Sequence, residues 1–230
     1  MERRQILADG ATCEIRVILY RLISVSLSVA ALLGAATVAH GGNDRIGQRL
    51  AAELVIMRGD IRLLGNPEIP KLHKQGLLSR LKGSLSVLPV LLREDGDPKT
   101  GVVDRLRNKL EQNDRTGFSD ILDAVIARHP LDLSALRGAK PEPNRLNRAH
   151  AIHNEACSGC HDTPDPETPL PARNLFKQAR RMSLDEFAAR LLNGVRGDSL
   201  TSLANPLSTE DISSLLVFYR NGMPREKTSD

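Results

Sequence analysis

The stretch "HNEACSGCHDTP", residues 153–164, carries two of the three cysteines of this 230-residue chain. Cys157 and Cys160 are separated by two small residues, and His161 follows at once. This C-x-x-C-H spacing is the attachment pattern of c-type haem, because it lets both sulfurs reach vinyl groups of one porphyrin. The adjacent histidine then offers an imidazole nitrogen to the iron. The pattern therefore predicts one covalent haem c, held by thioethers from Cys157 and Cys160 and by His161 as the proximal axial ligand.

Three other sites could use a closely spaced pair of cysteines. A structural zinc site takes four ligands, usually including a second Cys or His pair, and the remaining cysteine, Cys13, lies near the N-terminus. A thioredoxin-like dithiol needs a strand before the pair and a helix after it, whereas the surroundings here are helical and proline-rich. A disulfide across two residues would be strained and would close very little chain. Haem attachment is therefore the preferred interpretation.

The flanking sequence predicts helices on both sides of the motif. Residues 145–156 can form a helix that leads into the cysteines, and residues 162–174 are proline-rich and extended. Ser183 followed three residues later by Glu186 predicts a helix start with a capping box. A last helix is predicted after Ser208, with apolar residues on one side.

Residues 145–222 resemble a class I cytochrome c domain. That family begins with a helix that ends in C-x-x-C-H and closes with a helix that crosses the first; here these are "RLNRAHAIHNEACSGCH" and "LSTEDISSLLVFYRNG". At the crossing, where the family has a glycine and an aromatic residue, this chain has Ala149 and His153. The aromatic residue of the closing helix is present as Phe218 or Tyr219.

The resemblance also implies two residues that support the haem. The family has a proline whose carbonyl holds the axial histidine, followed by an apolar residue packed on the ring. Pro171 and Leu175 resemble them, within "LPARNLF". "LLNGVRG", residues 191–197, resembles the third helix of the family and its terminal glycine. The resemblance covers roughly a third of the chain, and the C-x-x-C-H motif is its specific part.

The chain departs from this family at the second iron ligand. The family usually supplies a methionine, followed by proline, from the loop that corresponds to residues 193–207. This loop contains no Met, His or Cys, and Leu200 stands near the expected position. A thioether ligand raises the haem potential, and leucine cannot bind iron. The identity of the sixth ligand therefore stays open at this point.

Three outcomes are possible for the distal face of the iron. Met182 is a possible distal ligand, although a hydrophobic contact before the helix cap is the commoner role for such a residue. His73 or His129 could bind if the N-terminal part docks over the haem. Otherwise the iron is five-coordinate, or weakly held by water or by Asn205. His150 and His153 precede the cysteines and are interpreted as packing or surface residues, like most histidines in such positions.

The N-terminal residues 1–39 predict an export signal. Four arginines precede an apolar run from Leu22 to Val38, and small residues favour cleavage after Ala39. An uncleaved membrane anchor is the alternative, because the run is close to the lower length limit for spanning a bilayer. Either way we expect the rest of the chain to be exported to the periplasm, with possible membrane association through this segment.

The exported part predicts an all-α protein with two modules. Apolar residues recur at three- and four-residue steps through residues 40–137, which predicts a helical, bundle-like module of unknown role. Pro89 is expected to kink or split the second of its helices. Residues 138–145 read as a linker. Residues 146–230 form the expected cytochrome c domain around one haem.

The composition sets limits on partners. Aromatic residues make up only 3% of the chain and tryptophan is absent, so the core must be aliphatic or completed by a cofactor. The net charge of +4 comes from interleaved acidic and basic residues. This charge pattern and the scarcity of aromatic residues argue against a nucleic-acid partner.

These observations predict an electron-transfer protein. One haem would pass single electrons between a periplasmic dehydrogenase or reductase and a respiratory partner. The chain is not expected to be an enzyme by itself, although it could be the electron-transfer subunit of an oxidoreductase complex. The alternative, which follows from the missing methionine, is a haem protein with an open or weakly ligated iron that binds or senses a small gaseous ligand.

Overall fold

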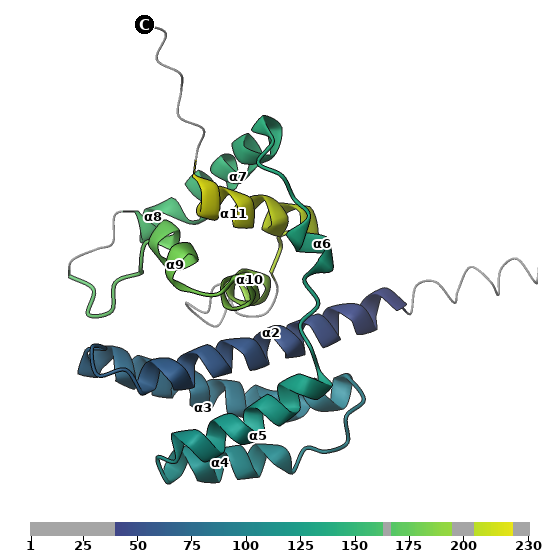
Figure 1. Ribbon diagram of the computed structural model, residues 1–230, viewed down its shortest axis with the longest axis vertical. Helices are drawn as coiled ribbons and strands as arrows, with labels where there is room; N and C mark the ends of the chain where they lie inside the picture. The colour runs from purple at the N-terminus through teal and green to yellow at the C-terminus, as the bar shows by residue number, and fades with distance from the viewer. Residues whose placement is uncertain (1–39, 163–166, 195–204, 223–230) are drawn as a thin grey trace, which may run out of the picture. The chain divides into compact units, whose positions relative to one another are not determined.

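The computed structural model describes residues 40–162, 167–194 and 205–222. Every regular element in these ranges is a helix (Figure 1), which confirms the predicted all-α class. None of these helices is long and apolar enough to cross a membrane. The predicted export signal in residues 1–39 and Leu200 lie outside the described residues.

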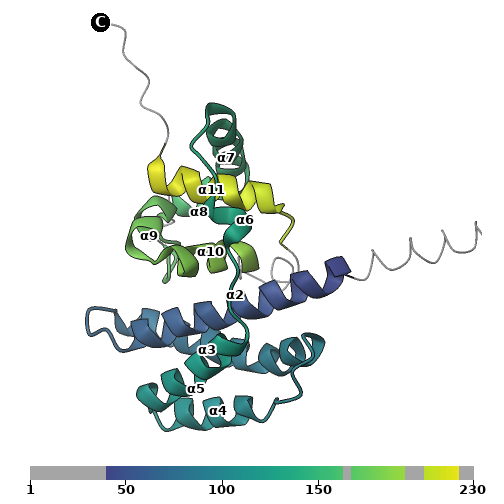
Figure 2. The same ribbon diagram turned by 45° about the vertical axis from the view of Figure 1, so that its right-hand side comes forward.

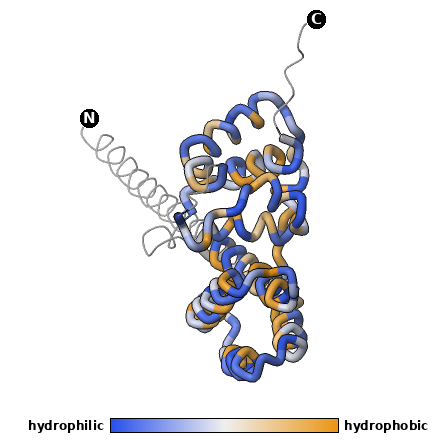
Figure 3. The backbone as a smooth tube through the Cα atoms, turned by 90° about the vertical axis from the view of Figure 1, so that its left-hand side faces the viewer, coloured by the Kyte–Doolittle hydropathy of each residue, from blue (hydrophilic) through white to orange (hydrophobic). Residues whose placement is uncertain are grey.

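The first set of helices carries the N-terminal apolar core. These helices are α2 (His40–Leu64), α3 (Lys71–Glu94), α4 (Val102–Glu111) and α5 (Arg115–Arg128). Apolar and polar residues alternate along them (Figure 3), as in amphipathic helices. The buried side chains of this core are Leu50, Leu54, Met57, Ile61, Leu64, Leu81, Leu85, Leu88, Leu91, Leu92, Val102, Val103, Leu106, Phe118, Leu122 and Val125.

Pro89 does not divide α3, which runs as one helix from Lys71 to Glu94. A proline has no amide hydrogen, so the carbonyl of Leu85, four residues earlier, loses its usual partner. Arg107 of α4 replaces that partner, because its Nη2 donates to the Leu85 carbonyl at 2.9 Å. A side chain from the next helix thus donates the hydrogen bond to the Leu85 carbonyl that proline cannot donate.

The second set of helices surrounds the C-x-x-C-H motif. It comprises α6 (Ser134–Arg137), α7 (Pro143–Ala156), α8 (Ser158–His161), α9 (Leu175–Arg181), α10 (Leu184–Asn193) and α11 (Thr209–Asn221). Helices α7 and α11 pack against each other (Figures 1 and 2). The buried apolar side chains here are Leu133, Leu136, Leu146, Ala149, Ala179, Phe187, Ala188, Ile212, Leu215, Leu216, Val217, Phe218 and Tyr219.

The helix boundaries differ from the sequence prediction in two places. Helix α7 begins at Pro143, inside the stretch 138–145 that was interpreted as a linker. Proline suits the first turn of a helix, where its missing amide hydrogen costs nothing. Helix α9 was not predicted, because seven residues are too few for a periodic pattern; Asn174 caps it by accepting from the Lys177 amide.

The capping box expected at Ser183 is only half formed. The Ser183 hydroxyl accepts from the Glu186 amide, as predicted. The Glu186 carboxylate does not return to the Ser183 amide but accepts from Arg62 and Arg190, each at 2.8 Å. A complete box occurs instead at the start of α11, between Ser208 and Asp211. Arg62 from α2 and Arg190 from the next turn of α10 compete successfully for Glu186 because they carry charge.

Helix α2 packs against α10, so that the two sets of helices share a buried interface. Ala52, Val55 and Ile56 of α2 form an apolar cluster with Ala189 of α10. Beside it lies Asp60, which is fully buried and forms a two-fold hydrogen-bonded pair with the guanidinium of Arg80. These contacts join the predicted module of residues 40–137 to the helices that follow it.

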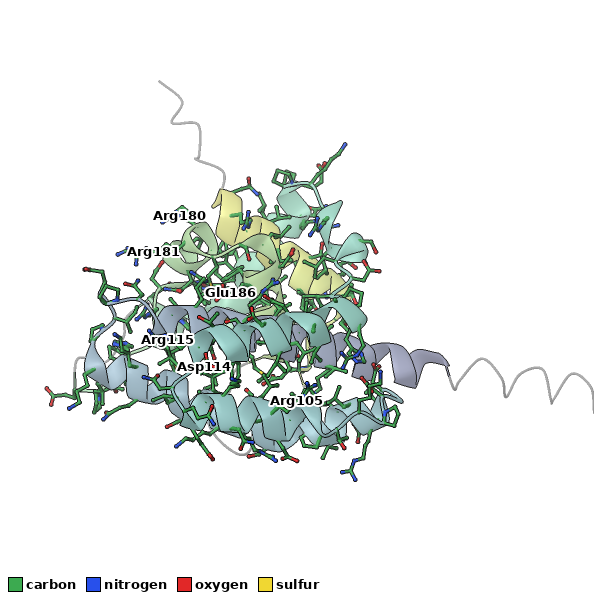
Figure 4. The ribbon with its side chains drawn as sticks, turned by 60° about the horizontal axis from the view of Figure 1, so that its bottom comes forward. Arg105, Asp114, Arg115, Arg180, Arg181 and Glu186 are labelled. Carbon is green, nitrogen blue, oxygen red and sulfur yellow. The ribbon has the colours of Figure 1, made fainter. Side chains whose placement is uncertain are left out.

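The ionic contacts continue from Asp60 into α10. Arg190 donates from Nη2 to Asp60 at 2.9 Å and to Glu186 at 2.8 Å. Burial by itself would lower the pKa of Arg190, but these two carboxylates outweigh it and raise the pKa. Figure 4 marks Glu186 and, at the end of α9, Arg180 and Arg181. We use the name ion network for Arg62, Asp60, Arg80, Arg190 and Glu186. The opposite charges of this network therefore compensate each other within the interface.

Candidate functional site

The C-x-x-C-H motif forms a helical turn at the end of α7. The amides of Cys160 and His161 donate to the Cys157 carbonyl at 3.3 Å and 3.1 Å. Residues three apart lie on the same side of a helical turn, so this turn brings the two cysteines to one side. Both are free thiols, Cys157 half-buried and Cys160 exposed. The turn can therefore present two thiols and an imidazole to a single group.

His161 is held by one backbone hydrogen bond. Its Nδ1 lies 2.6 Å from the carbonyl oxygen of Arg173, which can only accept, so Nδ1 carries the proton. The lone pair of a neutral ring is then on Nε2, which is the arrangement that a metal-binding histidine needs. This tautomer is the one that the predicted role of His161 as an axial ligand requires.

The carbonyl group that accepts from His161 does not belong to Pro171, the residue that the family resemblance suggested. The exposed Pro171 lies two residues earlier in the segment that leads to α9. The chain meets the imidazole at Arg173, directly before the cap residue Asn174. Leu175, the predicted ring-packing residue, is half-buried and packs against the core formed by α7 and α11.

The two unusual residues at the helix crossing are both buried. Ala149 is fully buried, and its small side chain allows α7 and α11 to approach closely. The ring of His153 lies among aromatic rings, with centroids 5.6 Å from Phe176, 5.7 Å from Phe218 and 5.6 Å from Tyr219. His153 thus occupies the place of an aromatic residue in this crossing.

His153 also makes two polar contacts. Its Nδ1 lies 2.9 Å from the Tyr219 hydroxyl, and its Nε2 lies 2.9 Å from the Asp162 carboxylate. Burial first, and then the side chain of Cys157, raises the pKa of Tyr219 well above its usual range. Sequence reasoning treated His153 as a packing or surface residue, and no spacing in the sequence reveals that Tyr219 and Asp162 meet it.

A polar cleft of about 630 Å³ opens beside His161. It is lined by Asn66, Glu68, Ile69, Pro70, His161, Asp162, Arg173, Asn174, Lys177, Gln178 and Arg181. Its walls come from the connection between α2 and α3 and from the segment around α9. The N-terminal helices therefore reach the neighbourhood of the motif.

His73 is close enough to Arg173, which lines this cleft, for their charges to interact. Burial first, and then the Arg173 guanidinium, lowers the pKa of His73. Three residues later in the same helix, a Cβ atom added at Gly76 would lie 3.3 Å from the Leu170 side chain. The first turns of α3 thus contact the segment that supplies the carbonyl partner of His161.

Of the proposed distal ligands, His129 is occupied by other partners and Met182 packs against the apolar core. Both ring nitrogens of His129 face carboxylates, Nδ1 at 2.7 Å from Asp95 and Nε2 at 3.1 Å from Asp97. Those contacts leave no ring nitrogen of His129 for iron. Met182, the possible ligand from the sequence, follows α9 as its C-cap and is half-buried against the apolar core.

Asn205 has a structural role at the end of α10. Its amide nitrogen donates to the carbonyls of Leu191 at 2.5 Å and Leu192 at 3.0 Å. Its Oδ1 accepts from the Leu207 amide at 3.0 Å. Asn205 therefore satisfies the last carbonyls of the helix, which a helix end leaves without partners. The suggestion of Asn205 as a weak iron ligand conflicts with this use of its amide group.

Within residues 40–162, 167–194 and 205–222 no group of three or more His, Cys, Asp or Glu side chains could hold a metal ion. A haem site needs no such group, because the porphyrin supplies four of the iron ligands and the protein adds axial ones. No protein-family model, curated protein or solved structure matches the chain. The motif and its local geometry are therefore the features of this chain that point to a function.

Proposed function

We propose that this protein is a c-type cytochrome that transfers single electrons through one covalently bound haem. The observation that carries the proposal is the geometry of His161, whose Nδ1 proton is held by the Arg173 carbonyl at the end of the C-x-x-C-H turn. This arrangement leaves Nε2 for an iron atom. The free thiols of Cys157 and Cys160 on the same turn support it.

The chain offers a distinct role for each residue of the site. Cys157 and Cys160 would hold the porphyrin through thioethers, and His161 would bind the iron on one face. Leu175 and the aromatic cluster at the helix crossing would exclude water from that side. When bound, the haem supplies a one-electron iron couple whose potential depends on axial ligation and burial.

Partners and compartment follow from the same proposal. We expect an exported, periplasmic protein that exchanges electrons with a dehydrogenase or reductase and with a respiratory partner. Helix α9 carries the exposed cations Lys177, Arg180 and Arg181, the last two labelled in Figure 4. Lys177 and Arg181 line the same cleft as His161. Such a group favours transient docking of an acidic partner surface, and the docking rate should fall with salt.

Covalent haem content tests the proposal directly. The full chain is expressed in a host that attaches c-type haem, and the denatured protein is analysed by mass spectrometry and by absorption in both redox states. We expect one haem per chain that resists denaturation, and reversible one-electron reduction. The double variant Cys157→Ser, Cys160→Ser should carry none. A wild-type chain without covalent haem would refute the proposal.

A second candidate is a haem protein whose iron keeps an open distal position. It is favoured by the occupied amide of Asn205 and the paired ring of His129, which remove two of the suggested ligands. Carbon monoxide distinguishes the two functions. An open site shifts its reduced spectrum on exposure to the gas, whereas a spectrum that is low-spin and unchanged by carbon monoxide excludes this candidate.

A further inference from the structure

His153 holds the C-x-x-C-H motif at both of its ends. Its backbone carbonyl accepts from the amide of Cys157, the first residue of the motif, at 2.9 Å. Its ring Nε2 lies 2.9 Å from the carboxylate of Asp162, the residue directly after the motif. An ionised carboxylate can only accept, so Nε2 carries the hydrogen and donates it. One residue of α7 therefore contacts the chain on both sides of the turn that contains the two cysteines and His161.

The ring of His153 is fixed in turn by the opposite helix. Its Nδ1 lies 2.9 Å from the hydroxyl of Tyr219 on α11, and its centroid lies 5.7 Å from that of Phe218. His153 is 3% exposed and Tyr219 is 0% exposed, so water does not compete at either group. Turning the ring would leave buried polar atoms without partners, which is costly. Asp162, His153 and Tyr219 thus form a chain of hydrogen-bonding groups that connects the helix crossing to the end of the motif.

The end of the motif depends on hydrogen bonds more than on apolar packing. His161 is half-buried, and the side chain of Asp162 is 41% exposed. The Asp162 amide donates to the Ser158 carbonyl at 2.9 Å, and His161 Nδ1 donates to the Arg173 carbonyl at 2.6 Å. The link from His153 to Asp162 is the contact that ties this part of the turn back to α7.

We propose that His153 is a positioning residue, which holds Asp162 and thereby fixes the direction in which His161 presents its imidazole to the haem iron. The inference rests on the proposed haem function and adds to it a role for two residues outside the C-x-x-C-H motif. An aromatic residue at position 153, as the family resemblance suggests, could pack in the same place but has no nitrogen for Asp162. Supporting contacts of this kind keep a ligand in its binding geometry before the metal arrives.

Two substitutions of Asp162 separate its hydrogen bond from its charge. Asp162→Ala and Asp162→Asn both remove the negative charge, but asparagine keeps an oxygen that can accept from Nε2. A difference between the two variants therefore reports the hydrogen bond. Because the side chain is 41% exposed, neither change leaves a cavity in the core. Glu155→Ala is the matched control, since it removes an exposed acidic side chain from α7 two residues before the motif.

The first measurement uses the haem-loaded full chain. In the proton NMR spectrum of the ferric protein, the shifts of the haem methyl groups depend on the plane of the axial imidazole. We expect Asp162→Asn and Glu155→Ala to keep the wild-type pattern and Asp162→Ala to change it. A loss of stability alone would not alter the pattern of the folded molecules. A wild-type pattern in Asp162→Ala, or an equal change in Asp162→Asn, would overturn the proposal.

The second measurement needs no haem. Amide hydrogen exchange is followed in the haem-free full chain, where the amides of His161 and Asp162 donate within the turn. We expect these two amides to exchange several-fold faster in Asp162→Ala and in His153→Phe, which keeps an aromatic ring, while the amides of α11 keep their protection. Unchanged exchange in the turn would overturn the proposal. So would an equal acceleration in α11, because that would indicate a loss of global stability and not a local opening.

Failure of the positioning role and failure of the proposed function give different results. If the wild-type chain acquires no covalent haem, the proposed function is refuted, and hydrogen exchange still shows whether His153 holds the turn. If the wild-type chain acquires haem and Asp162→Ala keeps the wild-type methyl pattern, the proposed function stands and the positioning role is refuted.

Discussion

Gly59 lies on α2 directly against the carboxylate of Glu186. A Cβ atom at this position would lie 2.3 Å from Glu186 Oε1, far closer than atoms normally approach. The carboxylate is 5% exposed and held by Arg62 and Arg190, so it has little freedom to move away. At this residue the close approach of α2 and α10 depends on the absence of a side chain.

We therefore expect Gly59→Ala to destabilise the protein by about 1–3 kcal/mol, the usual range for overpacking a buried site. Urea unfolding followed by circular dichroism measures the change. Gly83→Ala is the matched control, because a Cβ atom at Gly83 of α3 meets nothing within 4 Å. The control should be neutral or stabilising, since alanine favours a helix over glycine. Equal stabilities of the two variants would contradict the close contact.

Asp211 is the residue whose ionisation most clearly supports the last helix. Its side chain accepts from Arg148 at 2.6 Å and from the Ser208 amide at 3.0 Å, and it forms the capping box of α11. The hydrogen bond from Arg148, followed by that from Ser208, lowers the pKa of Asp211 to about 2. A lowered pKa means that the unfolded chain binds the proton first as the pH falls.

The contribution of Asp211 is therefore complete above about pH 4 and is lost as the pH falls toward 2. We expect Asp211→Asn to lower the free energy of unfolding by about 1 kcal/mol at pH 7, the size of a helix-cap effect. Between pH 4 and pH 2 the variant should lose stability less steeply than the wild type. Urea titrations at several pH values measure both effects, with Glu210→Gln in the same turn as control. Parallel pH curves for wild type and variant would count against the lowered pKa.

At the scale of single elements, helix α3 illustrates how a neighbour corrects a local defect. Pro89 leaves the Leu85 carbonyl without its helical partner, and Arg107 of α4 supplies one. Sequence periodicity predicted the helix on both sides of Pro89, because the apolar spacing continues through it. It could not predict the arginine, because the contact joins residues 22 positions apart.

A double-mutant cycle on Pro89 and Arg107 tests this compensation. Arg107→Ala should cost about 1 kcal/mol in the native background, because the Leu85 carbonyl loses its donor. In the Pro89→Ala background the helix regains its own amide donor, and the cost of Arg107→Ala should fall toward zero. The coupling is obtained from denaturant unfolding of the four proteins. Additive effects would mean that Arg107 does not replace the missing amide.

The difference between regular spacing along one helix and contacts between distant residues explains how much of the fold could be predicted from the sequence. The long helices α2, α3 and α5 have regular apolar faces, and the sequence placed them well. Helix α9 and the short α6 have too few residues for a period to show. The capping rule failed at Glu186, because its carboxylate pairs with Arg62, which is 124 positions away, and with Arg190 of the next helical turn, and not with its own helix cap.

For the candidate site, the sequence identified the groups but not their supports. The C-x-x-C-H spacing singled out Cys157, Cys160 and His161, because that chemistry is local. The carbonyl of Arg173 and the chain from Asp162 to Tyr219 depend on how α9 and α11 fold back onto α7. The haem itself and the distal ligand stay predictions, and the loop that includes Leu200 lies outside the described residues.

At the scale of the whole molecule, the ion network makes the two helix sets one structural unit. Asp60 is fully buried and is compensated by Arg80 and Arg190. Removing one partner of a buried ion pair leaves the other charge without compensation, which costs several kcal/mol. The stability of each helix set should therefore depend on the other, because residues 46–230 belong to one compact unit.

We expect Arg190→Met to destabilise the protein by about 3–5 kcal/mol and to replace a single unfolding transition by two. Differential scanning calorimetry and circular dichroism together reveal the number of transitions. Arg137→Met is the control. The side chains of Arg137 and its partner Asp185 are 57% and 43% exposed, so this ion pair should contribute less than about 1 kcal/mol to stability. Two transitions already present in the wild type would contradict the coupling.

The interface between α2 and α10 also limits how this protein can be divided. A cut near residue 138 looks natural from the sequence, since a proline-containing charged stretch follows. Such a fragment would present Glu186 and Arg190 without Arg62 and Asp60, beside the newly uncovered apolar surface of Ala189. Excised on its own, it is expected to aggregate, and a failed recombinant fragment would say nothing about haem. Screens for ligands and partners should therefore use the undivided chain.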